Sequence, residues 1–235
     1  MSPNKTWLFA ILIITVAITG CLGKPVRGPG REMLYSTVQL NTSDGVLITA
    51  SYYDSDADKG LILLHMLARD RHTFDDAAKR LQPHYKIIIP DLRGHGDSEG
   101  EYLDLTEKDF RDMVYDIESV ANYLKEEEQA ASISVAGASI GANLALTYAS
   151  EHPVDKLLLI SPGSRYRGID ISRISYGKPL LAQVGHYDGY SSISTDDLAL
   201  NWQRGRVMEY DTNAHGTDLI KTDLSASEDF FFYLT

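Results

Sequence analysis

Cysteine and positive charge are scarce in this sequence. The only cysteine among 235 residues is Cys21, which excludes an internal disulfide framework and any metal site built from several cysteines. Lys and Arg number 22 against 33 Asp and Glu, so the formal net charge is −11. Such a chain repels phosphate backbones, which argues against nucleic-acid binding. Hydrophobic residues make up 43% and charged residues 23%, a globular composition that argues against disorder, collagen and coiled coils.

Familiar cofactor motifs are also missing. No phosphate-binding loop of the form G-x-x-x-x-G-K-[ST] occurs. Gly94, Gly96 and Gly100 miss the spacing of a dinucleotide-binding loop, and no helix is expected to begin among them. His186 and Asp188 could belong to a metal site, but no other clustered ligands accompany them. We therefore expect neither a cofactor nor a metal ion.

The N-terminus carries an uncharged, mostly apolar run at residues 7–19, which follows Lys5. A membrane-spanning helix needs about 20 apolar residues, so this run is short for an anchor. A positive start followed by an apolar core of this length is typical of a secretory signal peptide. The run ends at Gly20-Cys21, which resembles the lipobox of prokaryotic lipoproteins. The resemblance implies cleavage before Cys21 and acylation of its sulfur.

Three segments are expected along the chain. They are a signal peptide at residues 1–20, a lipid-anchored Cys21 with a flexible tether at 21–34, and a globular domain at 35–235. The tether is inferred from glycines and prolines at 22–30, which show neither helical nor strand periodicity. Lipid on Cys21 would hold the domain at the extracytoplasmic face of a prokaryotic cell membrane. An uncleaved N-terminal transmembrane anchor is the alternative.

The rest of the chain alternates strand and helix patterns. A hairpin is expected at 38–53, turning at Asp44-Gly45. Near-continuous apolar runs, typical of strands buried on both faces of a parallel sheet, occur at 61–64, 87–89, 133–136, 157–160, 180–184 and 207–210. A one-sided apolar stripe predicts a helix over 106–127, begun by a capping box of Thr106 and Asp109. The alternation predicts an α/β fold, a doubly wound, mostly parallel sheet with an antiparallel N-terminal hairpin.

The pattern Gly137-x-Ser139-x-Gly141 follows one of these strands and opens a helical segment. This context is what a nucleophile elbow requires. Side chains two residues before or after the serine would clash in so tight a turn, and glycines remove the clash. The helix N-terminus also offers free N–H groups and positive potential where an oxyanion develops. Ser139 is therefore the candidate nucleophile.

With this motif the sequence resembles the α/β-hydrolase superfamily from about residue 38 to the C-terminus. The segment DLRGHGDS at 91–98 adds to the resemblance, because that family often carries D-x-R-G-H-G-x-S after its fourth strand. We interpret this segment as structural, so His95 is not our candidate base. A dehalogenase role is disfavoured, since that branch has Asp at the nucleophile position where this chain has Ser139.

The resemblance also implies an acid and a base, in the chain order nucleophile, acid, histidine. Asp188 follows the strand expected at 178–185 and is the candidate acid, whereas Asp196 and Asp197 are interpreted as exposed charges at a helix start. Of seven histidines, His215 has the required place, after the strand at 207–210 and before Gly216.

The tetrahedral intermediate needs two N–H donors. Ile140, next after the nucleophile, should supply one. The other should come from the loop after the strand at 61–64, where the family usually shows His-Gly-x and this chain has His65-Met66-Leu67. By that alignment we expect Leu67, with Met66 as the fallback. Methionine at the glycine position raises the question of the loop backbone, because Met disfavours positive φ.

The interval 161–178 is too short for the helical cap that many α/β-hydrolases insert there, and predicts a loop or one short helix with an open site. This interval contains Arg165, Tyr166, Arg167 and Tyr176. We interpret them as surface residues or as side chains that recognise an anionic or aromatic substrate.

The expected function is a cofactor-free serine hydrolase acting on carboxylic esters of a small-molecule acyl substrate. A thioesterase, peptidase or acyltransferase of the same fold, or a non-catalytic binding protein, is the alternative. The oligomeric state is not predicted.

Overall fold

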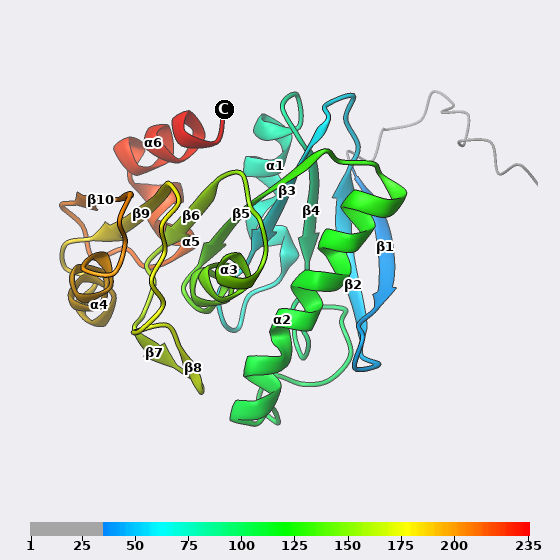
Figure 1. Ribbon diagram of the computed structural model, residues 1–235, viewed down its shortest axis with the longest axis horizontal. Helices are drawn as coiled ribbons and strands as arrows, with labels where there is room; N and C mark the ends of the chain where they lie inside the picture. Colours follow the sequence, from blue (N-terminus) through cyan, green and yellow to red (C-terminus); the bar gives the residue numbers. More distant parts are fainter. Residues whose placement is uncertain (1–34) are drawn as a thin grey trace, which may run out of the picture. The chain divides into compact units, whose positions relative to one another are not determined.

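The computed structural model describes residues 35–235, so the predicted signal peptide, Cys21 and tether lie outside the described residues. One sheet contains the strands β1 (Ser36–Asn41), β2 (Leu47–Tyr53), β3 (Lys59–Leu64), β4 (Lys86–Pro90), β5 (Ser132–Ala138), β6 (Leu157–Ile160), β9 (Leu180–Gly185) and β10 (Gly205–Tyr210). The longer helices are α1 (Asp75–Leu81), α2 (Glu107–Asn122), α3 (Ile140–Glu151), α4 (Gly189–Ala199), α5 (Thr217–Thr222) and α6 (Leu224–Leu234). Helices cover both faces of the sheet (Figure 1).

The strands of the sheet follow the order β1-β2-β4-β3-β5-β6-β9-β10. β1 and β2 form the antiparallel hairpin predicted from the sequence, and Gly45 adopts a φ of 91° in its turn. β2 pairs antiparallel with β4, and the remaining neighbours are parallel. The expectation of a mostly parallel α/β sheet with an antiparallel start is confirmed.

Side chains of the parallel strands face two apolar cores in alternation. Ile62 and Leu64 of β3 belong to a cluster shared with α2 and α3, whereas Leu61 and Leu63 belong to a cluster shared with α1 and α6. Successive side chains of a strand point to opposite faces, so a sheet covered on both faces requires an unbroken apolar run. Each of the six runs identified in the sequence lies within a strand, although the run at 207–210 is in the edge strand β10, where Glu209 is exposed.

Helix α2 begins as its sequence predicts. The Thr106 hydroxyl accepts the N–H of Asp109, and the Asp109 carboxylate accepts the N–H of Thr106 at 2.8 Å. Phe110, Met113 and Ile117 of the apolar stripe are buried. The α-helix ends at Asn122 and the chain continues as a π-helical turn, η2 (Tyr123–Glu127). Helical structure therefore reaches the predicted end at residue 127, but its last five residues are π-helical.

The interval between β6 and β9 forms a small hairpin. Its strands β7 (Arg165–Tyr166) and β8 (Ile169–Asp170) pair antiparallel, and Arg167 and Gly168 turn the chain with φ values of 50° and 79°. Figure 1 shows this hairpin between α4 and α2. The expectation of a loop or one short helix here needs this correction. The cause is the two consecutive residues with positive φ, which close a hairpin.

The segment at 91–98 joins distant loops through buried arginines. Arg71, in the short turn η1 (Arg71–Phe74), forms an ion pair with the buried carboxylate of Asp91. Arg93 lies 2.7 Å from Asp116 of α2 and 2.7 Å from Asp44 of the β1–β2 turn. The hydrogen bond from Arg93 lowers the pKa of Asp44 to about 2. The segment thus ties the N-terminal hairpin to α2, as a structural element would.

Among residues 35–235, no helix combines the length and the hydrophobicity that crossing a bilayer requires.

Candidate active site

Ser139 occupies the sharp turn between β5 and α3, with φ 53° and ψ −118°. A Cβ atom at Gly137 would lie 2.1 Å from the carbonyl oxygen of Gly141, and one at Gly141 would lie 2.4 Å from the carbonyl oxygen of Leu64. Neither position can therefore hold a side chain. A serine with positive φ is held only where the surrounding structure dictates it, and such positions cluster at functional sites. The turn has the strand–turn–helix context of a nucleophile elbow.

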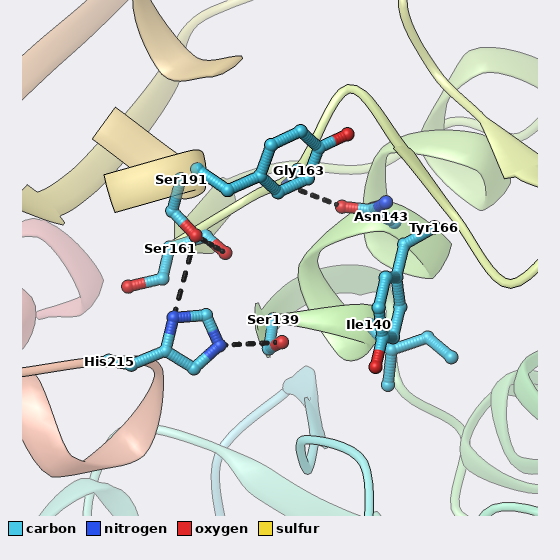
Figure 2. Close-up of a pocket in the computed structure, with 9 residues that line it drawn as sticks. Ser139, Ile140, Asn143, Ser161, Gly163, Tyr166, Ser191 and His215 are labelled. Atoms are coloured by element: carbon cyan, nitrogen blue, oxygen red, sulfur yellow. Dashed lines mark hydrogen bonds between the residues drawn. The ribbon is translucent and has the colours of Figure 1, made fainter. Parts of the chain in front are cut away.

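Ser139, His215 and Asp188 form one hydrogen-bonded chain. His215 Nε2 lies 2.8 Å from Ser139 Oγ (Figure 2). His215 Nδ1 lies 2.8 Å from Oδ2 and 3.0 Å from Oδ1 of Asp188. An ionised carboxylate can only accept, so Nδ1 carries the imidazole proton and Nε2 accepts from the serine hydroxyl. The parallel sheet brings the three together because each follows the carboxyl end of a strand, β5, β9 or β10.

Side chains from two other loops and from helix α4 hold the His215 loop in place. The Ser161 hydroxyl accepts the N–H of Gly216 at 2.9 Å, and Ser191 Oγ lies 3.4 Å from His215 Nδ1. The Thr217 hydroxyl donates to the Met66 sulfur at 3.4 Å. Reasoning from the sequence missed both serines, since neither Ser161 in its loop nor Ser191 at the start of α4 has a periodic signature. Only the place of Ser161, directly after the strand at 157–160, could have pointed to it.

The loop after β3 is fixed by His65, which is fully buried. Its Nδ1 donates to the Met66 carbonyl at 2.8 Å, and its Nε2 accepts the N–H of Leu92 at 3.0 Å. Burial lowers the pKa of His65 to about 4, in keeping with this neutral tautomer. In a planar trans peptide the N–H points opposite to the C=O. The N–H of Leu67 therefore points away from His65.

Met66 does not distort this loop. Positive φ occurs two residues later, at Ala68 with φ 56°, and Met66 is not among the described non-glycine residues with positive φ. The loop therefore does not require positive φ at the position where the family usually has glycine, and Met66 fits there without backbone strain. Among the residues that the structure describes, no acceptor pairs with the N–H of Ile140 or of Leu67.

A pocket of about 120 Å³ opens beside the nucleophile. It is lined by Ser139, Ile140, Asn143, Ser161, Gly163, Tyr166, Tyr190, Ser191 and His215. Of the interval 161–178, Tyr166 reaches this pocket, whereas Arg165 pairs with Asp170 at 2.9 Å and Tyr176 is buried in the core. The lining residues within residues 35–235 include no carboxylate.

The other candidate residues lie elsewhere. His186 Nδ1 is 3.1 Å from Glu209, and His95 is buried against His65 with a ring-centroid distance of 5.0 Å. Asp196 and Asp197 are exposed, as expected, but they lie in the second half of α4 rather than at its start. Within residues 35–235, no cluster of three or more His, Cys, Asp or Glu side chains could hold a metal ion.

Comparisons with curated proteins gave distant relatives. An uncharacterised protein of Mycobacterium tuberculosis is 24% identical over 145 residues, which cover 61% of this chain and 40% of that protein. A thermostable monoacylglycerol lipase of a Bacillus species is 30% identical over 103 residues, which cover 43% of this chain and 39% of the lipase. The chain thus spans about 40% of the length of these curated relatives.

Solved structures share the fold at low sequence identity. An esterase from Pyrococcus furiosus superposes with a TM-score of 0.69 at 19% identity, covering 91% of this chain and 100% of the esterase chain. An enol-lactonase from Burkholderia xenovorans superposes with a TM-score of 0.68 at 15% identity, covering 84% and 99%. These similarities confirm the α/β-hydrolase fold.

A family model shows membership more directly. Residues 55–185 match the family described as serine aminopeptidase, S33. The match includes Ser139 and ends before Asp188 and His215. It covers more than half of the chain. The chain therefore belongs to the serine aminopeptidase S33 family of the α/β-hydrolase superfamily.

Proposed function

We propose that this chain is a serine hydrolase that cleaves carboxylic esters through an acyl-enzyme intermediate. The proposal rests on one observation, which is that hydrogen bonds connect Ser139 Oγ through His215 to the Asp188 carboxylate. A serine hydroxyl is a weak nucleophile unless a base accepts its proton. Here Nε2 lies 2.8 Å from Oγ, a suitable distance for that transfer.

The reaction proceeds in two halves. Ser139 Oγ attacks the ester carbon while its proton moves to His215 Nε2, and Asp188 stabilises the resulting imidazolium. The tetrahedral intermediate collapses, the bond to the leaving oxygen breaks, and Nε2 returns its proton to that oxygen. Water then repeats the sequence, giving its proton to Nε2 and releasing the free acid and the Ser139 hydroxyl.

The oxyanion is proposed to bind the N–H groups of Ile140 and Leu67. Neither N–H has an acceptor among the described residues, and the Ile140 N–H belongs to the first turn of α3. Leu67 is preferred over Met66 because His65 holds the Met66 carbonyl and so directs the Leu67 N–H the other way. Loss of one such donor typically costs about 3–4 kcal/mol of transition-state stabilisation.

Esters are favoured over peptides with a free amino terminus by the pocket itself. An aminopeptidase must hold a cationic α-amino group, which a carboxylate does best. The described lining of the pocket supplies hydroxyls, an amide and aromatic rings but no carboxylate. Relatives named as a lipase and an esterase add support. Thioester cleavage and acyl transfer to an acceptor other than water use the same groups, and an acceptor-dependent product would reveal the latter.

The first test of the function uses a fluorophosphonate probe on the full-length chain, beside its Ser139→Ala variant. We expect the intact mass of the parent to rise by one adduct and that of the variant to stay unchanged, because only an activated serine attacks phosphorus. The variant should unfold at the parent's temperature. A folded parent that takes no label, or a variant labelled equally, contradicts the proposal and favours a binding protein on a hydrolase scaffold.

We also propose that Cys21 anchors the domain to the membrane through a covalent lipid. Support comes from the apolar run at 7–19 and from Gly20-Cys21 at its end. Replacing Cys21 with Ser should move the protein out of the membrane fraction or leave the precursor unprocessed, as read by fractionation and intact mass. If the parent mass shows no lipid and Cys21→Ser leaves fractionation unchanged, the uncleaved anchor is the correct alternative.

A further inference from the structure

The pocket beside Ser139 is small, and the β7–β8 hairpin contributes to its wall. Its volume of about 120 Å³ is close to that of a cavity of about 150 Å³ that holds one benzene molecule. Tyr166 of β7 lines the pocket together with Tyr190 of α4. A butyrate ester group, with its carbons and both oxygens, has as many heavy atoms as benzene. The pocket therefore has room for an acyl group of roughly four carbons.

The proposed mechanism decides which part of an ester enters this pocket. His215 Nε2 protonates the leaving oxygen, so the alcohol part lies on the His215 side of Ser139. The acyl substituent on the same tetrahedral carbon extends to the other side. Figure 2 shows Tyr166 on the opposite side of Ser139 from His215. An acyl chain that lengthens from the ester carbon therefore grows towards Tyr166.

Tyr190 fastens the hairpin to α4. Its Oη donates to the Arg165 carbonyl at 2.7 Å and accepts the Arg165 N–H at 2.8 Å. Ser164 Oγ lies 3.1 Å from the same oxygen. The Tyr190 ring also packs on Gly163, where an added Cβ would lie 2.8 Å from Cε1. The backbone directly before Tyr166 is thus fixed relative to the pocket.

Contacts with α2 hold the other end of the hairpin. A Cβ atom at Gly168 would lie 2.7 Å from the Cβ of Glu107, so the hairpin turn packs directly against α2. The Arg167 guanidinium lies 5.5 Å from the centre of the Phe110 ring and 5.9 Å from that of Tyr166, both cation–π distances. Tyr166 thus lies between two anchored segments, and a substrate cannot displace it without breaking their contacts.

Tyr166 lies where the pocket meets solvent, because it lines the pocket and is 37% exposed. Acyl carbons that fit inside the pocket leave water, and each buried methylene is worth about fourfold in binding. Carbons that extend past Tyr166 stay in water and contribute nothing of this kind. The benefit of a longer acyl chain should therefore end at Tyr166.

We propose that Tyr166 is the end wall of the acyl pocket and restricts the enzyme to esters of short acyl groups, up to about butyrate. This inference rests on the proposed ester hydrolysis and names its substrate class. Tyr166 is a specificity-determining residue in this account and takes no part in proton transfer.

The test uses the full-length protein and the para-nitrophenyl esters of acetic, butyric, hexanoic and octanoic acid, each below the concentration at which it aggregates. The measured quantity is kcat/KM for each ester divided by its rate constant for hydrolysis by hydroxide, which removes intrinsic reactivity. From acetate to butyrate we expect a rise of about tenfold, because two methylenes become buried. From butyrate to octanoate the rise should stop or reverse.

Tyr166→Ala opens the space that the ring occupies. The normalised ratio of hexanoate to butyrate should then exceed the parent's about tenfold, since two more methylenes become buried. A ratio between esters cancels any loss of activity that they share. Tyr187→Ala is the matched control, because Tyr187 is 63% exposed and lies outside the described lining of the pocket. Its ratio should equal the parent's.

Each outcome decides the matter. Parent values that keep rising through octanoate overturn the inference without any variant, so a poorly folded Tyr166→Ala protein does not weaken the test. A folded Tyr166→Ala protein with the parent's ratio also overturns it. A parent that takes the fluorophosphonate label but hydrolyses none of these esters limits the failure to the substrate class. If the parent shows neither label nor turnover, ester hydrolysis itself has failed, and the inference fails with it.

Discussion

Replacing Asp188 with Asn is expected to lower kcat for ester hydrolysis about 10,000-fold while leaving the fold intact. The asparagine NH₂ group would donate to His215 Nδ1, which forces the imidazole proton onto Nε2. Nε2 would then donate to Ser139 Oγ and could no longer take its proton. The positive charge that forms on His215 would also lose its partner. Steady-state kinetics with para-nitrophenyl butyrate measures the loss, and fluorophosphonate labelling should slow in parallel.

Two further variants sharpen this result. Asp197→Asn makes the same chemical change on an exposed residue of α4 and should keep the parent's activity. Ser191 Oγ lies 3.4 Å from His215 Nδ1 and can accept a hydrogen bond from Nδ1–H, which favours the productive tautomer in the Asp188→Asn protein. Adding Ser191→Ala should therefore reduce the residual activity further. Activity of Asp188→Asn within tenfold of the parent would remove Asp188 from the proposed mechanism.

Replacing Arg93 with Leu is expected to destabilise the domain by about 3–5 kcal/mol. Asp116 is fully buried, and Arg93 is its ion-pair partner at 2.7 Å. Without the guanidinium, the carboxylate is left buried and uncompensated. The β1–β2 turn would also lose the contact between Arg93 and Asp44 at 2.7 Å. Urea unfolding followed by circular dichroism measures the change in the free energy of unfolding.

The double variant Arg93→Leu/Asp116→Leu distinguishes a buried charge from lost packing. Because an apolar pair leaves no unpaired charge, it should recover part of the lost stability. Arg204→Leu is the control, since Arg204 is exposed, and its effect should stay within about 0.5 kcal/mol. A single Arg93→Leu variant as stable as this control would show that the buried pair contributes nothing to folding.

Local patterns were sufficient for most of the fold. The apolar runs predicted their strands because a sheet covered on both faces admits few polar residues, and Asp44-Gly45 predicted the first hairpin because glycine adopts positive φ at little cost. Gly137 and Gly141 predicted the tight turn at Ser139 for steric reasons that the structure makes explicit. The hairpin at 165–170 was missed, since neither of its two-residue strands is long enough to show a period.

The surroundings of the site required the tertiary structure. Its hydrogen bonds join residues far apart in the sequence. Gly216 and Ser161 are 55 residues apart, Gly163 and Asn143 are 20 apart, and Ser191 and His215 are 24 apart. Such contacts leave no trace in local periodicity, because they depend on which loops the sheet order brings to one edge. The hydrogen bond from His65 to the Met66 carbonyl also depends on the tertiary structure. His65 is oriented by the N–H of Leu92, and the two residues meet because β3 and β4 are neighbours in the sheet.

The types of the longer elements, the turn at Ser139 and the chain order of the candidate residues follow from the sequence, because sterics and burial act on neighbours along the chain. The fold sets the hydrogen-bonding distances among Ser139, Asp188 and His215, the orientation of the Leu67 N–H and the unpaired Nδ2 of Asn143. Those depend on packing between segments far apart in the chain, where differences of a few tenths of an ångström decide whether a hydrogen bond forms.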